Sequence, residues 1–410
     1  MLLHHGNRSA IRTPLPPPHA TTSLFGVPVL TSSSPTDEAS FKAEWPKVPI
    51  NFGSRRGQTA SQGHCQWFAF SPVRNFGALV ASWRGLPSFD TTRARCAIAE
   101  DSMRLGRLVV ILVVLAAGAG AAFYALTAPS VDVRGELPAR QADLANGQSM
   151  FFAGGCFSCH GTPKQEDHTK LGGGLALQTP FGTFKVPNIS SDPKFGIGAW
   201  SEPEFVNAIK RGVGRNGEHL YPAFPYTSYQ RMRLDDVRDL YAFLKTLPAV
   251  ATPSEPHQLS FPFNVRRGLG LWKLIYVDGK TFVRDSSKDD VVNRGAYLVE
   301  GPGHCAECHS PRNLFGGIIR ERRFAGGPDP EGKGWVPNIT PHADGIANWS
   351  QKDIAYLLET GFTPDSDSVG STMADVVLNT AKLSPDDRAA MAIYIKSLPV
   401  RPGKAPPKKQ

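Results

Sequence analysis

Two five-residue motifs carry the chemistry of this chain. CFSCH occupies residues 156–160 and CAECH occupies residues 305–309. In C-x-x-C-H the two thiols can add to the two vinyl groups of a porphyrin, and the adjacent histidine then lies under the iron as its proximal ligand. The residues that we predict to hold haem covalently are Cys156, Cys159, Cys305 and Cys308, with His160 and His309 as axial ligands of the iron.

Zinc sites and thioredoxin-like redox pairs also use closely spaced cysteines. Neither of them needs a histidine directly after each second cysteine. Since both motifs have that histidine, and both stand at matching places in a repeat, covalent haem is favoured. The remaining cysteines, Cys65 and Cys96, lie in an irregular N-terminal region and have no predicted function.

A haem used only for electron transfer needs a sixth ligand, and methionine is the usual choice where a raised potential is needed. Met373, in GSTMADVV, lies 64 residues after His309 and before the last predicted helix. Met391 falls inside that helix and is predicted to be a core residue. We therefore predict Met373 as the sixth ligand of the second haem.

The sixth ligand of the first haem has several candidates. Alignment of the two copies puts Phe224 close to the place of Met373, and phenylalanine cannot bind iron. Met232 is the only methionine between His160 and the end of the first copy, although it aligns with a leucine, Leu383. We favour Met232. The alternatives are His219, which would give a bis-histidine haem of lower potential, His168, and an open site.

Four sequence blocks repeat at a constant offset of 149–151 residues. Besides the haem motifs, they are VPNIS and VPNIT, GIGAWSEPEF and GIANWSQKDI, and DDVRDLYAFLKTLP and DDRAAMAIYIKSLP. A constant offset over several blocks indicates a duplicated domain. The predicted domains are residues 139–250 and 291–400, joined by a packed connector over residues 251–290 and followed by a disordered basic tail over residues 401–410.

Each copy is predicted to be mostly helical. Ser201 and Ser350 are typical N-caps, each followed by apolar residues at helical spacing. Pro248 and Pro399 are expected to end the last helix of their copies. The asparagine side chains of the two V-P-N-I blocks, or the Ser and Thr hydroxyls two residues later, are candidates for hydrogen bonds to the haem propionates.

An apolar segment precedes the repeat. A basic start at Arg104 and Arg107 is followed by 24 uncharged residues, from Leu108 to Val131. As a helix these would span about 36 Å, enough for a membrane core. Residues 103–131 are therefore predicted to be a signal-anchor or transmembrane segment. The positive flank places the following domains outside the cytoplasm.

Residues 1–102 are rich in Pro, Ser and Thr and have little apolar periodicity. They are predicted to be disordered or a spurious extension, with Met103 as the true start. The whole chain has a net charge of +9 and 41% hydrophobic residues, which is ordinary for a globular protein. Because no basic stripe is interleaved with aromatic residues, no nucleic-acid partner is predicted.

From about Gly147 to Pro399 the chain resembles the multihaem cytochrome c subunits of bacterial membrane-bound dehydrogenases. The blocks that carry this resemblance are GGGLALQTPFGTFKVPNIS, GIGAWSEPEF, GEHLYPAFPYTSY and GPGHCAECHSPRN. Many of those subunits have three haems, where this chain has two motifs. The resemblance implies two tandem class I cytochrome c-like domains after an N-terminal transmembrane helix. It further implies a catalytic dehydrogenase subunit as electron donor, and the quinone pool or a terminal oxidase as acceptor, at the periplasmic face of the bacterial inner membrane.

Two functions remain open at this point. An electron carrier needs two haems with all six iron ligands filled. A dihaem enzyme such as a peroxidase needs one iron with an exchangeable sixth position. No Rossmann fingerprint, flavin motif or catalytic triad is present in the sequence. We therefore predict an electron-transfer subunit and not an enzyme.

The first prediction concerns stoichiometry. Because each motif offers two thiols, the intact mass of the purified protein should exceed that of its polypeptide by two haem groups. Mass spectrometry under denaturing conditions measures this directly, since covalent haem stays attached. A mass increase of a single haem would contradict the presence of two attachment sites.

Overall fold

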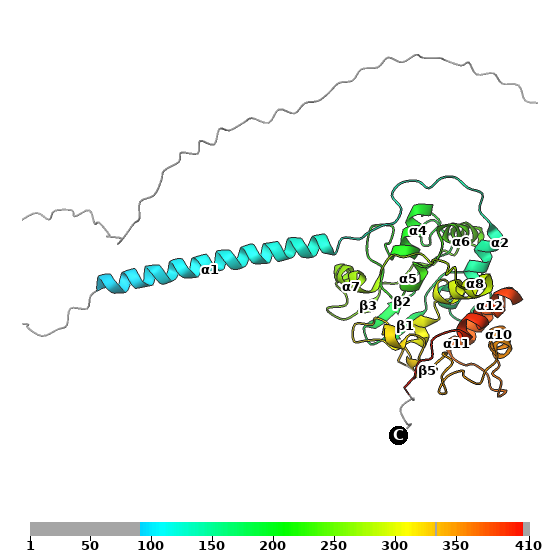
Figure 1. The fold of residues 1–410 in the computed structure, drawn as a ribbon. Helices are drawn as coiled ribbons and strands as arrows, with labels where there is room; N and C mark the ends of the chain where they lie inside the picture. Colours follow the sequence, from blue (N-terminus) through cyan, green and yellow to red (C-terminus); the bar gives the residue numbers. More distant parts are fainter. Residues whose placement is uncertain (1–90, 333, 405–410) are drawn as a thin grey trace, which may run out of the picture. The chain divides into compact units, whose positions relative to one another are not determined.

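The computed structural model describes residues 91–404 except residue 333, so Cys65 and the predictions for residues 1–90 and 405–410 lie outside it (Figure 1). The described part is mostly helical, as predicted. Its α-helices are α1 (Thr91–Leu126), α2 (Leu144–Ala153), α3 (Cys156–His160), α4 (Glu202–Arg211), α5 (Tyr226–Tyr229), α6 (Leu234–Thr246), α7 (Leu269–Tyr276), α8 (Asp290–Glu300), α9 (Ala306–His309), α10 (Gln351–Thr360), α11 (Thr372–Thr380) and α12 (Pro385–Lys396). The short 3-10 helices η1 (Arg266–Gly268) and η2 (Arg320–Arg322) complete the helical elements of the described part.

Short antiparallel strands follow each haem motif. In the first copy β1 (Ala176–Thr179) pairs with β2 (Gly182–Lys185), and Leu177 lies opposite Phe184. The connector adds β3 (Gln258–Leu259) to the free edge of β2. In the second copy β4 (Gly327–Pro328) pairs with β5 (Trp335–Val336). The connector is therefore tied to the first copy by strand pairing.

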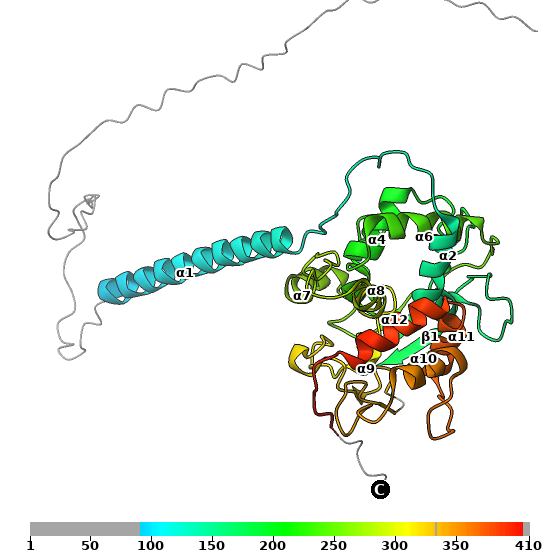
Figure 2. The ribbon, with the colours of Figure 1, turned by 45° about the vertical axis from the view of Figure 1, so that its right-hand side comes forward.

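Two helix pairs dominate the packing. α2 lies against α6, and α8 lies against α12, so the first and last helices of each copy are in contact (Figures 1 and 2). Gly147 of α2 crosses directly over the backbone of Asp239, and Gly295 of α8 crosses over the backbone of Ala390. A Cβ at either glycine would overlap the facing carbonyl oxygen. The absence of a side chain is what lets each helix pair come so close.

The helices α4 and α10 begin in the same way. Ser201 accepts a hydrogen bond from the backbone of Glu204, whose carboxylate accepts one from the Ser201 backbone. Ser350 and Asp353 form the same reciprocal capping box at the start of α10. Each box satisfies two backbone donors that a helix start leaves without partners. The predicted N-caps are therefore confirmed.

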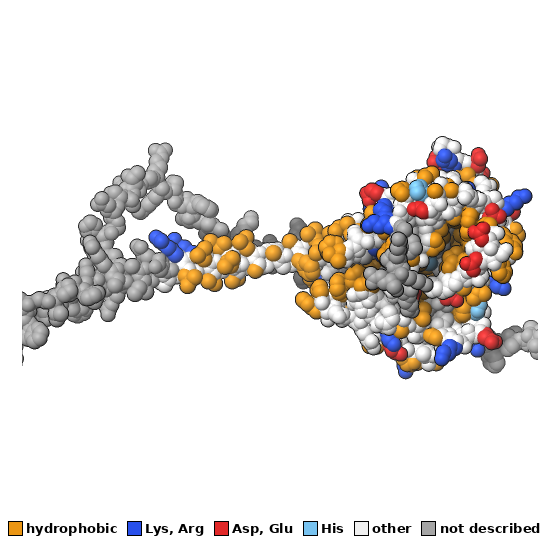
Figure 3. All heavy atoms as spheres, turned by 90° about the horizontal axis from the view of Figure 1, so that it is seen from below, with side chains coloured by type: hydrophobic (Ala, Val, Ile, Leu, Met, Phe, Trp, Pro, Cys, Tyr) orange, Lys and Arg blue, Asp and Glu red, His pale blue; other side chains and the backbone are white. Residues whose placement is uncertain are grey.

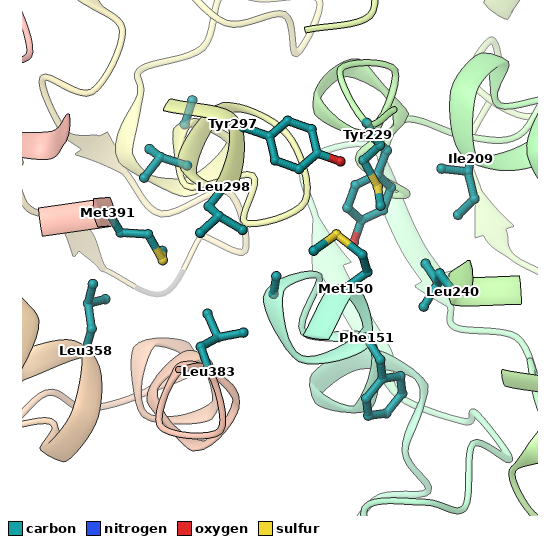
Figure 4. Packing of buried hydrophobic residues seen from close by; sticks show 14 of the residues in the cluster. Met150, Phe151, Ile209, Tyr229, Leu240, Tyr297, Leu298, Leu358, Leu383 and Met391 are labelled. Carbon is teal, nitrogen blue, oxygen red and sulfur yellow. The ribbon is translucent and has the colours of Figure 1, made fainter. Parts of the chain in front are cut away.

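One apolar cluster runs through both copies. Its buried members include Met150 and Tyr229 from the first copy and Tyr297 and Leu298 from the second (Figure 4). Tyr297 also donates a hydrogen bond to Asp236 at the start of α6. Because the core is shared, the packing of each copy depends on the other.

Helix α1 is longer than the sequence predicted at its N-terminal end and shorter at its C-terminal end. It starts at Thr91, before Met103, and ends at Leu126, before the predicted limit at Val131. The stretch Ser102–Leu126 has a mean hydropathy of 2.5, and none of it is buried. Hydrophobic side chains cover the visible side of α1 (Figure 3). This helix is long and apolar enough to cross a membrane.

Two predictions about the ends of the repeat need correction. The connector is ordered, but its apolar side chains are not all buried: Phe261 is 80% exposed and Leu271 is exposed as well. The first residues of the predicted disordered tail are held in place. The Arg401 carbonyl accepts a hydrogen bond from Asn338, and the Gly403 amide donates to Asp344.

The helix crossings yield a second prediction. Gly147→Ala should destabilise the protein by about 1–3 kcal/mol, because the added methyl group forces α2 away from α6. Gly268→Ala is the matched control, since its φ is −60° and its Cβ would meet nothing within 4 Å. The control should be neutral or stabilising by up to about 1 kcal/mol. Denaturant unfolding in detergent measures both, and equal effects would contradict the close-crossing argument.

Candidate functional site

Each haem motif is a short helix that follows a sharp change of chain direction. Gly155 precedes α3 with φ of 56°, and His304 precedes α9 with φ of 38°. Both values lie in the left-handed region that glycine adopts most readily. The shared geometry shows that the two motifs are presented to their surroundings in the same way.

The two histidine rings are held by the same contact. His160 Nδ1 lies 2.8 Å from the Pro187 carbonyl oxygen, and His309 Nδ1 lies 2.9 Å from the Pro337 carbonyl oxygen. A carbonyl only accepts, so Nδ1 carries the proton and the lone pair is on Nε2. Burial lowers the pKa of His160 to about 4 and also lowers that of His309, which keeps both rings neutral. A neutral imidazole with a free Nε2 is the form that binds a metal.

The loops that hold these rings are fixed in turn. The Gly173 amide donates to the carbonyl oxygen of His160, and the Gly326 amide donates to that of His309. These glycines have φ of 71° and 70°, and a Cβ on either would overlap the V-P-N backbone. A second contact therefore fixes the distance between each histidine and its proline loop.

The asparagines of the V-P-N-I blocks have a different role from the one predicted. Asn188 donates to the carbonyl oxygens of Val250 and Thr252. Asn338 donates to Asp344 and to the Arg401 carbonyl. Since their amide donors are engaged with the end of each copy, these residues tie the proline loops down and are not available to haem propionates.

The four motif cysteines are free thiols. Burial raises the pKa of Cys156 and Cys305 to about 12, and that of Cys159 and Cys308 to about 11. They are therefore neutral at physiological pH. Two S–H groups that can add across two vinyl groups, next to an imidazole with a free Nε2, are the donor set of haem c. The residues present fit this cofactor at both motifs.

The motifs contact each other's copy in a reciprocal way. Ser158, the second variable residue of the first motif, accepts a hydrogen bond from Asn379 of α11 at 2.8 Å. Glu307, the same position of the second motif, accepts bonds from Thr227 and Ser228 of α5 at 2.6 and 2.7 Å. Ser228 and Asn379 are themselves equivalent by the repeat offset. Each motif thus rests on the corresponding segment of the other copy.

The motifs also meet directly. His304 Nε2 lies 3.3 Å from the Gly154 carbonyl oxygen, so the residues that precede Cys156 and Cys305 are neighbours. Tyr229 donates to the same carbonyl oxygen at 3.0 Å, and its ring lies against that of His304. The arrangement places the two attachment sites side by side in the shared core.

Glu307 is a buried charge at this contact. Arg312 forms an ion pair with it at 2.7 Å. Burial alone would raise the pKa of Glu307, but Arg312 and the two hydroxyl donors reverse this and hold the pKa below its ordinary value. The carboxylate is therefore ionised, and it stabilises the contact between the copies only as long as its partners are present.

The predicted methionine ligands lie in different settings. Met373 is half-buried at the start of α11, a helix that contacts α10 as well as α2 and α3. Met232 is 1% exposed, and its carbonyl oxygen accepts a hydrogen bond from the buried Lys210. Leu383 is buried in the same cluster and its carbonyl oxygen likewise accepts from a basic side chain, that of Arg388. Ligation by either methionine stays a prediction.

The alternative ligands of the first haem also have defined surroundings. His219 is buried, with Nε2 donating to the Thr127 carbonyl oxygen at 2.9 Å, next to the end of α1. His168 is half-buried, and its ring stacks on that of Phe157 of the first motif at 3.7 Å. Phe224 packs edge-on against Tyr229. His168 is therefore in contact with the motif itself.

Comparisons with known proteins agree with this site. The family model for cytochrome c matches residues 144–248. A diheme cytochrome c-type protein of Cereibacter sphaeroides is 47% identical over 68% of this chain and 94% of its own length. Such a match shows that the chain belongs to the cytochrome c family. The cofactor that this fold and these motifs hold is haem c.

Two further relatives define its place in that family. The fructose dehydrogenase cytochrome subunit of Gluconobacter japonicus is 35% identical over 64% of this chain, and the cytochrome c subunit of the quinone alcohol dehydrogenase of Gluconobacter oxydans is 35% identical over 69%. The matches span 54% and 60% of those relatives. The predicted class, an electron-transfer subunit and not a catalytic one, is confirmed, and these relatives lend no support to a peroxidase.

Sequence reasoning found the thiols and histidines but missed the residues that hold them. Pro187 and Pro337 were part of a recognised repeat, but it is their backbone carbonyl oxygens that contact the histidine rings. Every residue has such a carbonyl, so the residue type does not reveal the contact. Ser158 and Glu307 occupy variable positions of the motif. By the repeat offset Ser158 corresponds to Glu307, and Ser228 corresponds to Asn379. The polar character of all four residues was the signal that could have indicated a reciprocal contact.

A third prediction tests this contact. Glu307→Gln should destabilise the folded protein by about 1–3 kcal/mol, because Arg312 then lacks its counter-charge. Ser158→Ala removes the equivalent side chain without leaving a charge and should cost about 1 kcal/mol. Guanidinium unfolding of the holo-protein, followed by haem absorbance, measures both. Equal losses would show that the charge at residue 307 contributes nothing.

Proposed function

We propose that this chain carries two haem c groups, one on each of two tandem class I cytochrome c-like domains. It would pass electrons from a catalytic dehydrogenase subunit to the quinone pool or a terminal oxidase. The proposed domains are the predicted ones, residues 139–250 and 291–400. Haem iron supplies reversible one-electron chemistry, and the protein supplies its ligands and surroundings.

The observation that carries this proposal is the contact between the two motifs through Gly154 and His304. Two haems attached to adjacent motifs would lie close together, with buried side chains and no bulk water between them. The reciprocal contacts of Ser158 and Glu307 hold that spacing. Such an arrangement suits transfer between haems within one protein.

The membrane-spanning helix supports the proposed location. Arg104 and Arg107 precede the uncharged stretch that begins at Leu108, so by the positive-inside rule the start of α1 would lie in the cytoplasm and the haem domains in the periplasm. Attachment of haem c outside the cytoplasm agrees with this orientation. Residues 103–131 would keep the chain in the bacterial inner membrane.

For the sixth ligands we propose Met373 for the second iron and Met232 for the first. Met373 is half-buried at the start of α11, which packs against α10 of its own copy and against α2 and α3 of the first copy. Met232 is the only methionine between His160 and the end of the first copy. Its equivalence with Leu383 leaves a purely structural role open, and His219 is the alternative ligand.

A fourth prediction separates these ligands. Met373→Ala should abolish an iron–sulfur charge-transfer band in the red part of the ferric spectrum, because the sulfur ligand is lost. Met232→Leu should make the first haem high-spin, while His219→Ala should leave it low-spin. Ferric absorption spectra and redox titrations of the purified variants show which residue binds each iron. The reverse outcome for the last two variants would make the first haem bis-histidine.

The proposed function itself is tested on the intact complex. The chain should co-purify with a catalytic subunit, and both haems should be reduced when that subunit's substrate is added. Two low-spin ferric haems that bind neither cyanide nor carbon monoxide are expected. A high-spin haem that binds carbon monoxide and consumes hydrogen peroxide would instead indicate an enzyme.

A further inference from the structure

We propose that the connector helix α7 lies in the surface of the membrane that α1 spans, with its outer side inserted among the lipids. This inference rests on the proposed membrane anchor and goes beyond it. It gives the connector a role in orienting the haem domains, which a single spanning helix would leave free to rotate.

The first observation is the amphipathic character of α7. Leu271, Leu274 and Ile275 stand at positions i, i+3 and i+4, so they share one side of the helix. All three are exposed, Leu274 by 63% and Ile275 by 66%. An apolar side of this kind, left uncovered on a folded domain, indicates a partner or a membrane.

The opposite side of α7 is attached to both copies. Lys273 Nζ donates to the carbonyl oxygens of Arg211 and Gly212 at the end of α4. Trp272 donates its indole N–H to the Phe315 carbonyl oxygen at 2.9 Å. Since the inner side is used for anchoring, the outward direction of the three apolar side chains is fixed by the fold.

The second observation is where α7 is attached. Gly270 packs against Thr127, the first residue after α1, so closely that a Cβ would overlap the Thr127 backbone. Arg267 donates to Thr127 Oγ1 at 2.9 Å and to the Tyr124 carbonyl oxygen at 2.6 Å. The connector therefore touches the chain at the point where the apolar span ends.

Tyr124 fixes the depth of this contact. It lies in the last turn of the span, it is 70% exposed, and the Arg267 guanidinium lies 4.4 Å from its ring centre. Exposed tyrosines near the ends of spanning helices lie at the level of the lipid headgroups, and arginine reaches the same level. Because Arg267 and Gly270 belong to the same connector, the start of α7 lies at that level as well.

The neighbouring loop extends the same surface. Phe261 is exposed by 80%, and Phe263 and Val265 are exposed too. Residues 261–284 contain five basic residues and one acidic residue. Exposed aromatic and aliphatic side chains with a net positive charge are the composition of segments that lie in the surface of anionic membranes. A lipid surface therefore fits the connector better than a second protein does.

The test uses the full-length holo-protein in vesicles that contain anionic phospholipid and a phospholipid with a photoactivatable group near the top of one acyl chain. After illumination, peptides are mapped by mass spectrometry. We expect label on α1 and on the peptide that contains Leu271–Ile275. Label on α1 alone would overturn the inference, and absence of label from α1 would overturn the membrane anchor and the inference together.

Matched variants make the result specific. The double variant Leu274→Glu with Ile275→Glu leaves the inner side of α7 intact, so its haem absorbance and unfolding midpoint should not change. Labelling of the connector should fall severalfold while labelling of α1 stays the same. Tyr356→Glu, at an exposed position of α10, should change neither.

The competing occupant is the catalytic subunit. If it covered α7, the double variant would slow electron transfer from that subunit in detergent, where no bilayer is present, and the connector of the unaltered protein would take up no lipid label. That pair of results would overturn the inference in favour of a protein interface. Unchanged transfer in detergent together with connector labelling supports the membrane.

Discussion

The structure depends on the reciprocal contact of each haem motif with the other copy. Ser158 and Glu307 occupy the same variable position of C-x-x-C-H, and their partners Asn379 and Ser228 are equivalent too. A contact that crosses between copies in both directions explains why the apolar core is continuous, with Tyr297 packed among residues of the first copy. It also explains why the motifs meet, since each motif is hydrogen-bonded to a helix of the other copy. A duplicated domain that folded independently would need none of these contacts.

Within each copy, the histidine of the motif is positioned by backbone atoms of a neighbouring loop. The carbonyl oxygens of Pro187 and Pro337 determine which imidazole nitrogen carries the proton. The asparagine after each proline ties that loop to the end of its copy. The proline carbonyl oxygen holds the histidine ring, and the asparagine holds the proline loop, so the orientation of the ring is fixed. The segment that follows the last helix of each copy therefore helps to fix the loop that orients the histidine.

The sequence predicted much of this and failed in specific places. Thiols and histidines are recognisable because their side chains do the chemistry, and the capping boxes at Ser201 and Ser350 depend on local residue types. The role of Asn188 was wrong, because its donors are taken by carbonyl oxygens about sixty residues away, and no local pattern records such a partner. The exposure of Phe261 was missed for a related reason. Apolar composition indicates burial, but it does not distinguish a protein core from a lipid surface.

The two copies share their framework but not their charges. At the contact between copies the first motif offers a neutral hydroxyl, whereas the second offers the carboxylate of Glu307, balanced by Arg312. The copies differ again at the predicted sixth-ligand position, where Phe224 stands in the place that Met373 takes in the alignment. Both differences lie in side chains, while the glycine crossings and proline loops are the same. The repeated segments thus share the framework that brings the two motifs together, whereas the side chains around the motifs differ. Since the surroundings of a haem set its potential, haems bound at the two motifs would differ in potential.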